Sequence, residues 1–431
     1  MAKGFIVCPK KNYEYDVVVC GGGFAGVCAA VSSAKNGART VLIENGGELG
    51  GDITKSIVPQ ILDTKDKGGM VKELLDFLIA HEKTCVRKGM RFDENGRKIS
   101  GSMVDLEYVK YYLDKICLEF DVDIMYHSTL VSAKCESGKI CEILVASECG
   151  AFTVNGKIFI DTTGNGALAA MCGCEFKFGD PVKGLPQPCS TSMLVTGLDE
   201  NLRSTDTNND KVIFKKLLEE KGIKISAEWM SLVKVPQEGG RLISFNNQYN
   251  VFVDDAMSLS EATRLARVEC IEVVEQMKKL DEFKNMEVLS VSSHIGIREG
   301  RRIKGLYTLT FDDITEGSRF DDAVCSAEFP IDVHKICEND STDHKKGKRV
   351  QTYNIPYRAL VAADCENLLL AGRCISGDFY AHASYRVAGN VIPMGEAAGY
   401  AAAICVKESK APSQIDGKQV REYMEAMGYL M

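Results

Sequence analysis

The chain has 431 residues, of which 45% are hydrophobic and 26% are charged. This composition is typical of a globular protein with room for two domains, and it excludes a largely disordered chain. The excess of 60 acidic over 52 basic residues gives a formal net charge of -8, which argues against nucleic acid as a partner. Because no apolar run reaches about 18 residues, we expect no membrane span.

Glycine and cysteine stand out in this composition. The 39 glycines gather in clusters, which usually indicates backbone that approaches another group closely. The 17 cysteines form no repeated C-x-x-C pairs, so we expect no metal site, although a redox relay through the closely spaced Cys172 and Cys174 remains an alternative. Because the start of the chain shows no apolar secretory segment, we expect reduced thiols and a cytoplasmic location.

The segment 15–44 is typical of one βαβ unit. A β-branched run at 16–20 predicts a buried parallel strand, and the glycine-rich stretch 21–26 follows it directly. Small residues then predict a helix over 25–35, and residues 40–43 predict the second strand. The unit therefore places a glycine-rich turn between a strand and a helix.

That turn carries the spacing of a dinucleotide site. Gly21, Gly23 and Gly26 form G-x-G-x-x-G, and Glu44 follows at the end of the second strand. The glycines permit a tight turn, a close approach of pyrophosphate and close packing of helix on strand, while the acid can accept hydrogen bonds from ribose hydroxyls. An ordinary turn is the alternative for the glycines alone.

A second glycine cluster indicates which dinucleotide is bound. It consists of Gly46, Gly47, Gly50 and Gly51. A flavin needs bare backbone further along the sheet edge, whereas a nicotinamide domain does not, so the cluster favours a flavin over a simple flexible loop. The stretch 164–169 is also G-x-G-x-x-A after a strand and could serve NAD(P)H, but no second βαβ unit follows it.

The remaining pattern predicts two domains. Helices are expected at 72–85, 105–120 and 259–279, and a last helix is expected from Ile392 or Pro393. An antiparallel insertion is expected at 123–127, 130–135, 140–147 and 152–154. A buried strand is expected at 157–163 and a returning strand at 367–371. We therefore predict an α/β fold with a Rossmann-like domain at 12–174 and 346–431. An inserted α+β substrate domain, or cap, is predicted at 175–345, and the polar run 338–348 is predicted to be a loop.

Several stretches together resemble a known family. They are DVVVCGGGFAGVCAA, VLIENGGELGG, IDTTGNGALAA, NLLLAGRCISG and HASYRVAGNVIPMGEAAGYAAA. They resemble the FAD-dependent oxidoreductases related to the fumarate reductase flavoprotein and glutathione reductase superfamily. More narrowly, GIREGRRIKGLYTLTFDD, FPIDVH and IPYRAL look like a bacterial family labelled only FAD-dependent oxidoreductase.

The resemblance implies a set of FAD-binding residues. Arg373 stands where relatives of glutathione reductase carry an acid, and Asp52 follows Gly51 where members with covalent FAD carry a histidine, so we expect FAD to be held non-covalently. The expected cofactor contacts are Gly21, Gly23, Phe24, Ala25, Gly26, Glu44, Asn45, Gly50, Gly51, Thr163, Gly164, Gly372, Arg373, Pro393 and Gly395. Proline suits a first helical turn, so we expect the helix beginning near Pro393 to direct its positive end toward the flavin.

Hydride transfer to a flavin requires substrate binding and the handling of one proton. Arginine suits an anionic substrate, and Arg298 and Arg386 are the expected pair because they lie in the family-like motifs. His382 and His334 are the expected proton carriers. Further substrate contacts are expected from Arg302, Tyr357, Arg358 and Tyr385.

The sequence therefore predicts an FAD-dependent oxidoreductase that acts on a small organic substrate with a polar or anionic group. A monooxygenase or halogenase on the same scaffold is one alternative. An FAD-binding electron-transfer subunit that works with a partner chain is another. An external electron donor or acceptor and an oligomeric state both remain open.

Overall fold

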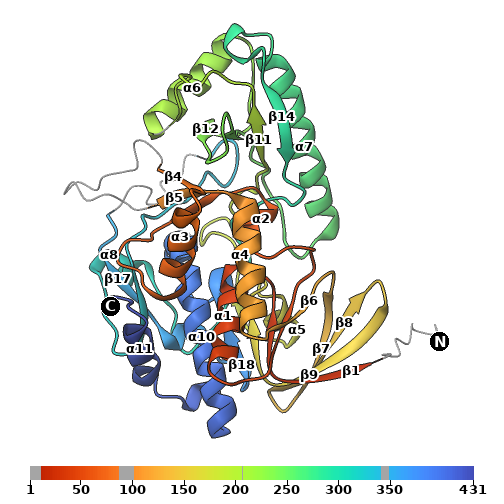
Figure 1. The fold of residues 1–431 in the computed structure, drawn as a ribbon, viewed down its shortest axis with the longest axis vertical. Helices are drawn as coiled ribbons and strands as arrows, with labels where there is room; N and C mark the ends of the chain where they lie inside the picture. Colours follow the sequence, from red (N-terminus) through yellow and green to blue (C-terminus); the bar gives the residue numbers. More distant parts are fainter. Residues whose placement is uncertain (1–10, 87–100, 206, 341–348) are drawn as a thin grey trace.

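The computed structural model describes residues 11–86, 101–205, 207–340 and 349–431. Residues 341–348 of the expected polar loop lie outside these ranges. Within them, no helix is long and apolar enough to cross a membrane. The chain forms a mixed α/β unit in the lower part of Figure 1 and a smaller unit above it.

A seven-stranded sheet organises the lower unit. Its parallel part consists of β6 (Asp123–Met125), β2 (Thr40–Ile43), β1 (Asn12–Cys20), β9 (Gly150–Asp161) and β18 (Leu368–Leu370). The long strand β9 pairs with β1 along one edge. Along its other edge, β9 pairs with β18 in parallel and with β8 (Lys139–Ser147) in antiparallel orientation. Strand β8 pairs in turn with β7 (Thr129–Glu136). The predicted antiparallel insertion is therefore a β7–β8 hairpin that pairs through β8 with the first half of β9.

Two details of this sheet differ from the sequence prediction. Strand β6 pairs with β2 in parallel, so 123–127 belongs to the parallel sheet and not to the antiparallel insertion. Residues 152–154 and 157–163 were expected to be separate strands, with Asn155 and Gly156 between them. Both residues instead continue the pairing with β1, opposite Glu14 and Tyr15, so β9 is one strand.

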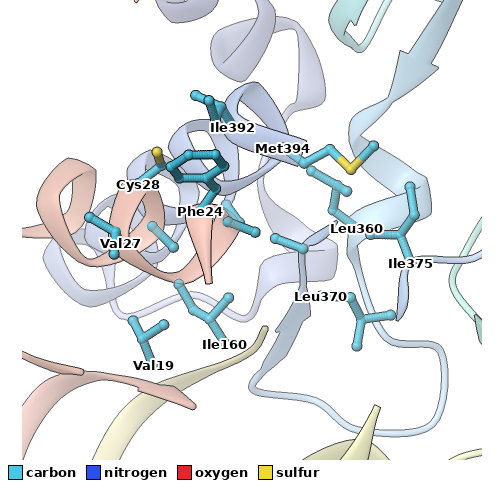
Figure 2. Packing of buried hydrophobic residues seen from close by; sticks show 14 of the residues in the cluster. Val19, Phe24, Val27, Cys28, Ile160, Leu360, Leu370, Ile375, Ile392 and Met394 are labelled. Carbon is cyan, nitrogen blue, oxygen red and sulfur yellow. The ribbon is translucent and has the colours of Figure 1, made fainter. Parts of the chain in front are cut away.

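Helices α1 (Phe24–Lys35) and α10 (Ala388–Glu408) pack on this sheet and on each other. Gly395 and Gly399 permit the close contact, because a Cβ at either position would lie 2.1 Å from the carbonyl oxygen of Ala25 or 2.2 Å from that of Ala29. Figure 2 shows the core around this contact, which includes Val19, Phe24, Val27, Cys28, Ile160, Leu370, Ile392 and Met394.

The last long helix begins earlier than the sequence predicts. Helix α10 starts at Ala388, with Val387 as its N-cap, and Pro393 lies inside it. The expectation of a helix beginning at Pro393 is therefore wrong. Pro393 is the sixth residue of the helix, so it removes the backbone hydrogen bond to the carbonyl oxygen of Gly389, and its ring crowds that carbonyl. The positive end of α10 consequently lies at Ala388 to Val391.

Further helices and short strands complete the lower unit. The helices are α2 (Asp52–Lys55), α3 (Gly69–Ala80), α4 (Leu106–Glu119), α5 (Ala167–Met171), α8 (Phe311–Glu316), α9 (Phe379–Tyr385) and α11 (Gly417–Ala426). Strands β3 (Gln60–Leu62), β5 (Gly101–Val104) and β4 (Thr84–Val86) form a small sheet. The helix expected at 72–85 ends at Ala80. Thr84 and Cys85, which were expected to be its last residues, lie in β4 instead.

The upper unit of Figure 1, which we call the cap, has its own sheet and core. Its strands are β12 (Ser231–Lys234), β13 (Arg241–Ser244), β11 (Ser192–Thr196) and β14 (Glu287–Val291), in that order. Helices α6 (Asn208–Glu220) and α7 (Ala256–Met277) complete it, the latter close to the predicted 259–279. The buried cluster of the cap draws its residues from 193–286.

Residues between the cap and the predicted boundary at 345 pack with the lower unit. Strand β16 (Ala323–Ala327) pairs with β17 (Tyr353–Pro356), and β15 (Arg302–Ile303) pairs with β10 (Phe176–Lys177). Ile331, Val333 and Ile336 belong to the main hydrophobic core. The predicted division at 175–345 stays a prediction, and the packing favours a smaller cap.

Candidate functional site

A cavity of about 480 Å³ opens at the carboxyl end of the parallel sheet. Residues after β1, β2, β9 and β18 form most of its wall, as expected for a ligand site of a doubly wound sheet. Leu259, His294 and Ile297 contribute from the cap side. The expected cofactor residues that line the cavity are Gly21, Gly23, Phe24, Ala25, Glu44, Asn45, Gly50, Gly51, Thr163, Gly164, Gly372 and Arg373.

The first glycine loop shapes the cavity floor. Gly21 has a φ of +107°, and a Cβ there would lie 2.6 Å from the carbonyl oxygen of Thr162. A Cβ at Gly26 would lie 1.8 Å from the carbonyl oxygen of Gly21. At Gly23, by contrast, a Cβ would meet nothing closer than the Cα of Gly51 at 3.9 Å. Gly21 and Gly26 therefore close the turn, while Gly23 leaves space in the cavity.

The N-terminus of α1 faces the same space. Gly23 is the N-cap and provides no side-chain hydrogen bond to the free N–H groups of the first turn. Those groups and the positive end of the helix suit an anion such as a pyrophosphate. The bare glycines and the open helix end together fit the expected FAD.

Glu44 holds the two glycine loops together. Its carboxylate accepts hydrogen bonds from the backbone N–H of Gly22 at 2.7 Å and of Gly46 at 2.5 Å. It also forms an ion pair with Lys55, and its side chain is buried. The predicted contact with ribose hydroxyls would therefore add to this role in shaping the loops.

The second glycine loop packs directly on the first. Gly50 has a φ of +107° and donates its N–H to the carbonyl oxygen of Gly22 at 2.9 Å. A Cβ at Gly51, which has a φ of +60°, would lie 3.0 Å from the Cα of Gly23. Bare backbone thus lines the cavity along both loops, as a flat ring system requires.

Arg373 connects three segments at the cavity wall. It forms an ion pair with Asp52, donates from Nε to the carbonyl oxygen of Gly164 at 3.1 Å and donates from Nη2 to Asn165 Oδ1 at 2.9 Å. Arg373, which stands where relatives of glutathione reductase carry an acid, therefore has its charge balanced by Asp52. The ion pair with Arg373 also engages the carboxylate of Asp52, the residue that stands where members with covalent FAD carry a histidine.

His294 is the only histidine among the described residues that line the cavity, and the sequence analysis did not identify it. It follows β14 in a segment that returns from the cap. The surrounding protein lowers the pKa of His294, chiefly through burial, although Asp52 opposes this effect. Its imidazole is therefore neutral at pH 7 and able to accept a proton.

Arg386 is the predicted catalytic residue that lines the cavity. Its guanidinium donates to the carbonyl oxygens of Arg298 at 2.5 Å and of Asp332 at 2.8 Å, and lies 3.8 Å from the Asp332 carboxylate. Burial lowers the pKa of Arg386 to about 10. Burial would raise the pKa of Asp332, but His334, Arg386 and Arg298 lower it to about 2. Asp332, whose side chain is 43% exposed, is therefore an anion with three basic side chains near it.

Arg298 and His334 lie behind Arg386 and do not line the cavity. Arg298 donates to the carbonyl oxygen of Pro188 at 2.6 Å, and its side chain contributes to the charge around Asp332. His334 lies 3.8 Å from the Asp332 carboxylate and packs against Trp229. The structure thus brings three of the four predicted catalytic residues together around Asp332, which the sequence analysis did not select.

His382 is fully buried and does not line the cavity. Neither ring nitrogen has a hydrogen-bond partner among the described residues, and its ring contacts Tyr385 edge to face. Burial lowers the pKa of His382 well below its usual value. His382 is therefore a neutral core side chain in this structure, and its catalytic role stays a prediction.

The predicted substrate residues also lie away from the cavity. Arg302 is buried against Glu299 and the carbonyl oxygen of Gly179, and Tyr385 donates to the carbonyl oxygen of Ile375 at 3.1 Å. Tyr357 donates to the carbonyl oxygen of Pro412 at 2.9 Å, and Arg358 pairs with Asp322. Gly26, Pro393 and Gly395, expected at the cofactor, lie behind the wall.

The comparisons with known proteins agree with this fold. A family model described as FAD dependent oxidoreductase matches residues 16–424. No curated protein sequence matches the chain. Among solved structures, the chain is similar in fold to the anhydrotetracycline hydroxylase OxyS from Streptomyces rimosus, with a TM-score of 0.50 and 14% identity over 96% of this chain and 65% of that chain.

Two further structures are similar. One is a triple mutant of the flavin-dependent brominase Bmp2, with a TM-score of 0.50 and 12% identity over 96% of this chain and 84% of that chain. The other is a geranylgeranyl bacteriochlorophyll reductase-like protein from Thermoplasma acidophilum, with a TM-score of 0.46 and 12% identity over 96% of this chain and 83% of that chain. The expected link to fumarate reductase and glutathione reductase is not confirmed by these structures.

Proposed function

The chain belongs to the FAD-dependent oxidoreductase family, and from this premise we propose that it transfers hydride between non-covalently bound FAD and a small organic substrate with an anionic group. The observation that carries the proposal is that the glycine loops, His294 and Arg386 line one shared cavity. It combines a place for the cofactor, a neutral imidazole and a cation. These are the parts that hydride transfer to or from an anion requires.

Bound FAD supplies the two-electron acceptor, and this chain supplies the rest. The backbone N–H groups at the start of α1 would hold the pyrophosphate of FAD, and the loops at Gly23 and Gly51 would leave room for its flat rings. The Arg386 guanidinium would orient the substrate anion, since Arg386 lines the cavity and carries the positive charge. A ring nitrogen of His294 accepts the proton that the substrate loses.

Non-covalent attachment is supported by the position of Asp52. Its carboxylate is engaged by Arg373, and a carboxylate in this position offers no nucleophilic imidazole to the flavin. Acid precipitation of the FAD-loaded protein should release all of the flavin into the supernatant. Yellow pellets after precipitation would contradict non-covalent binding.

Reconstitution with FAD tests the first half of the proposal. The full-length protein, mixed with FAD and freed of excess cofactor, should retain the visible absorbance of an oxidised flavin. Bleaching of that absorbance by small carboxylates under anaerobic conditions tests the second half. The variant Arg386→Ala should keep the flavin yet lose bleaching by anions, whereas Arg358→Ala, at a residue that does not line the cavity, should bleach normally.

Two further measurements on the FAD-loaded protein distinguish the alternative functions. A monooxygenase or halogenase would react rapidly with oxygen after reduction, which stopped-flow mixing with air would reveal. An electron-transfer subunit would be bleached only when a partner protein is added. Either outcome would replace the dehydrogenase or reductase proposed here.

A further inference from the structure

The cap contributes apolar side chains to the cavity wall that the proposed chemistry does not use. Leu259, in the first turn of α7, and Ile297, in the segment that returns from the cap, line the cavity together with His294. The sequence analysis selected neither of them as a site residue. In ligand cavities, apolar walls bind the hydrocarbon part of a ligand, while a few polar groups fix its orientation.

Ile297 lies beside the cation of the cavity. Arg298 follows it directly in the chain, and the carbonyl oxygen of Arg298 accepts a hydrogen bond from Arg386 Nη1 at 2.5 Å. On the other side of Ile297, Gly296 exchanges two backbone hydrogen bonds with Ser190, at 2.8 and 3.1 Å. The backbone on both sides of Ile297 is therefore fixed, with the guanidinium of Arg386 bound one residue away.

Leu259 extends this apolar part of the wall. It packs against a small buried cluster that includes Ile295 and Ile297, and this cluster is distinct from the main core and from the buried cluster of the cap. Ile297 is 6% exposed, whereas Leu259 is only partly buried. These contacts bring Arg386, Ile297 and Leu259 together in one part of the cavity wall.

The first turn of α7 is held at the cavity from two sides. Asp255 is the N-cap of the helix, and its side chain accepts hydrogen bonds from two N–H groups of that turn. Asp254 lies 3.5 Å from Arg301, which donates from Nη1 to the carbonyl oxygen of Asn165 at 3.3 Å. Because Asn165 lines the cavity, Leu259 is connected to the opposite unit through this bridge.

The cofactor loops come from other elements. The expected FAD contacts that line the cavity lie in the loops after β1, β2, β9 and β18 of the lower unit. Leu259 and Ile297 belong to none of these loops and approach from the cap side. Their side chains are therefore available to a substrate that enters beside the cofactor.

We propose that Leu259 and Ile297 determine the substrate class, and that the substrate is a carboxylate with a hydrocarbon body, alkyl or aryl, in place of a small polar acid. This assignment rests on the proposed function, because it takes Arg386 as the partner of the carboxylate. With the carboxylate at the guanidinium, the carbon chain extends past Ile297 toward Leu259. Each CH2 group that leaves water there raises the affinity about fourfold.

Binding of unreactive carboxylates tests the proposal without any turnover. The full-length, FAD-loaded protein is titrated with acetate, propionate, butyrate, pentanoate and hexanoate in a calorimeter. We expect the dissociation constant to fall about fourfold with each added CH2 group. A dissociation constant that is independent of chain length, or that rises with it, would overturn the assignment.

Two leucines of α7 provide a matched pair of variants. Leu259→Ala should bind hexanoate about tenfold more weakly and acetate as the wild type does. Leu265→Ala, the same substitution at an exposed residue that does not line the cavity, should bind the whole series normally. Arg386→Ala should weaken every member by a similar factor and keep the dependence on length. Unchanged hexanoate binding in Leu259→Ala, or a loss of FAD affinity in its place, would contradict the role of Leu259.

These results are separable from a failure of the proposed function. A clear dependence on chain length without bleaching of the flavin by any carboxylate would support the apolar site and contradict hydride transfer. Bleaching by small polar acids at rates that do not change with chain length would support hydride transfer and contradict the apolar site. The wild-type series decides these points, so the outcome does not depend on the folding of Leu259→Ala.

Discussion

At the scale of single residues, two glycines of the first loop should respond differently to the same substitution. Gly26→Ala places a Cβ 1.8 Å from the carbonyl oxygen of Gly21, so we expect a loss of about 3 kcal/mol in the free energy of unfolding. Gly23→Ala adds a Cβ that meets only the Cα of Gly51 at 3.9 Å, so stability should change by less than about 0.5 kcal/mol. Urea unfolding of the apo protein measures both values.

The same pair should separate folding from cofactor binding. Because the added methyl of Gly23→Ala occupies the space in front of the α1 N-terminus, the dissociation constant for FAD should rise about tenfold, or about 1.4 kcal/mol. Fluorescence titration with FAD measures this value. Unchanged affinity in Gly23→Ala would show that the pyrophosphate lies elsewhere.

His294 makes a prediction about pH. Since burial holds its pKa below the usual 6.5, the imidazole is neutral at pH 7 and becomes protonated only as the pH falls through that lowered pKa. A protonated ring cannot accept the substrate proton, so the rate of flavin reduction should fall at acidic pH. In His294→Gln the rate should drop about 100-fold and lose this dependence.

A surface histidine provides the control for this experiment. His81 is exposed, its ring lies tilted against that of Phe77, and it does not line the cavity. The variant His81→Gln should keep both the rate and the pH profile of the wild type, measured by anaerobic stopped flow. An unchanged acidic limb in His294→Gln would assign the proton to another group.

The residue scale also shows what sequence can and cannot predict. Gly21, Gly23 and Glu44 were predictable because one βαβ unit places them together through local chain geometry. His294 and Asp332 reach the site only through long-range packing of the cap and of segment 331–334, and no local pattern marks them. His382 lies close in sequence to the cavity residues Arg373 and Arg386, yet His382 itself does not line the cavity.

At the scale of elements, the contact between α1 and α10 decides how firmly the first loop is held. Gly399→Ala places a Cβ 2.2 Å from the carbonyl oxygen of Ala29 and 2.9 Å from the Cβ of Ser32, so the helices must separate. We expect a loss of about 1–3 kcal/mol in the free energy of unfolding and weaker FAD binding, because α1 carries the loop. Urea unfolding and FAD titration measure the two effects.

The matched control lies on the same helix. Lys407 is exposed near the end of α10, and Lys407→Ala should change the stability by less than about 0.5 kcal/mol. Equal effects of Gly399→Ala and Lys407→Ala would mean that helix propensity, and not the close helix contact, determines the response.

Element boundaries were less predictable than element types. The strand, glycine loop and helix at 16–35 follow from periodicity and turn chemistry, and the structure confirms them. The start of α10 was misplaced because proline is favoured in a first turn, yet the small residues at 388–390 already allow the helix to begin there. Strand β6 was placed in the wrong part of the sheet because three residues carry no information about their pairing partner.

At the scale of the whole molecule, the cap has a buried cluster of its own, while Val233, Val235 and Leu242 of the cap join the main core. Sequence alone indicated two domains, but it could not show that segments such as 323–336 pack with the lower unit. The assignment of these residues depends on pairings such as β16 with β17, which join distant parts of the chain. The cavity lies where both units contribute to one wall.

Cofactor binding should therefore couple the two units. On addition of FAD, amide hydrogen exchange should slow at 21–26 and 50–55 of the lower unit and also at 294–297, which approaches the cavity from the cap. At a free FAD concentration 100 times the dissociation constant, the protection should correspond to about 2.7 kcal/mol. Helix α6 does not line the cavity and should exchange at the same rate with and without FAD, which makes it the internal control. Protection restricted to the lower unit would show that His294 does not reach the bound cofactor.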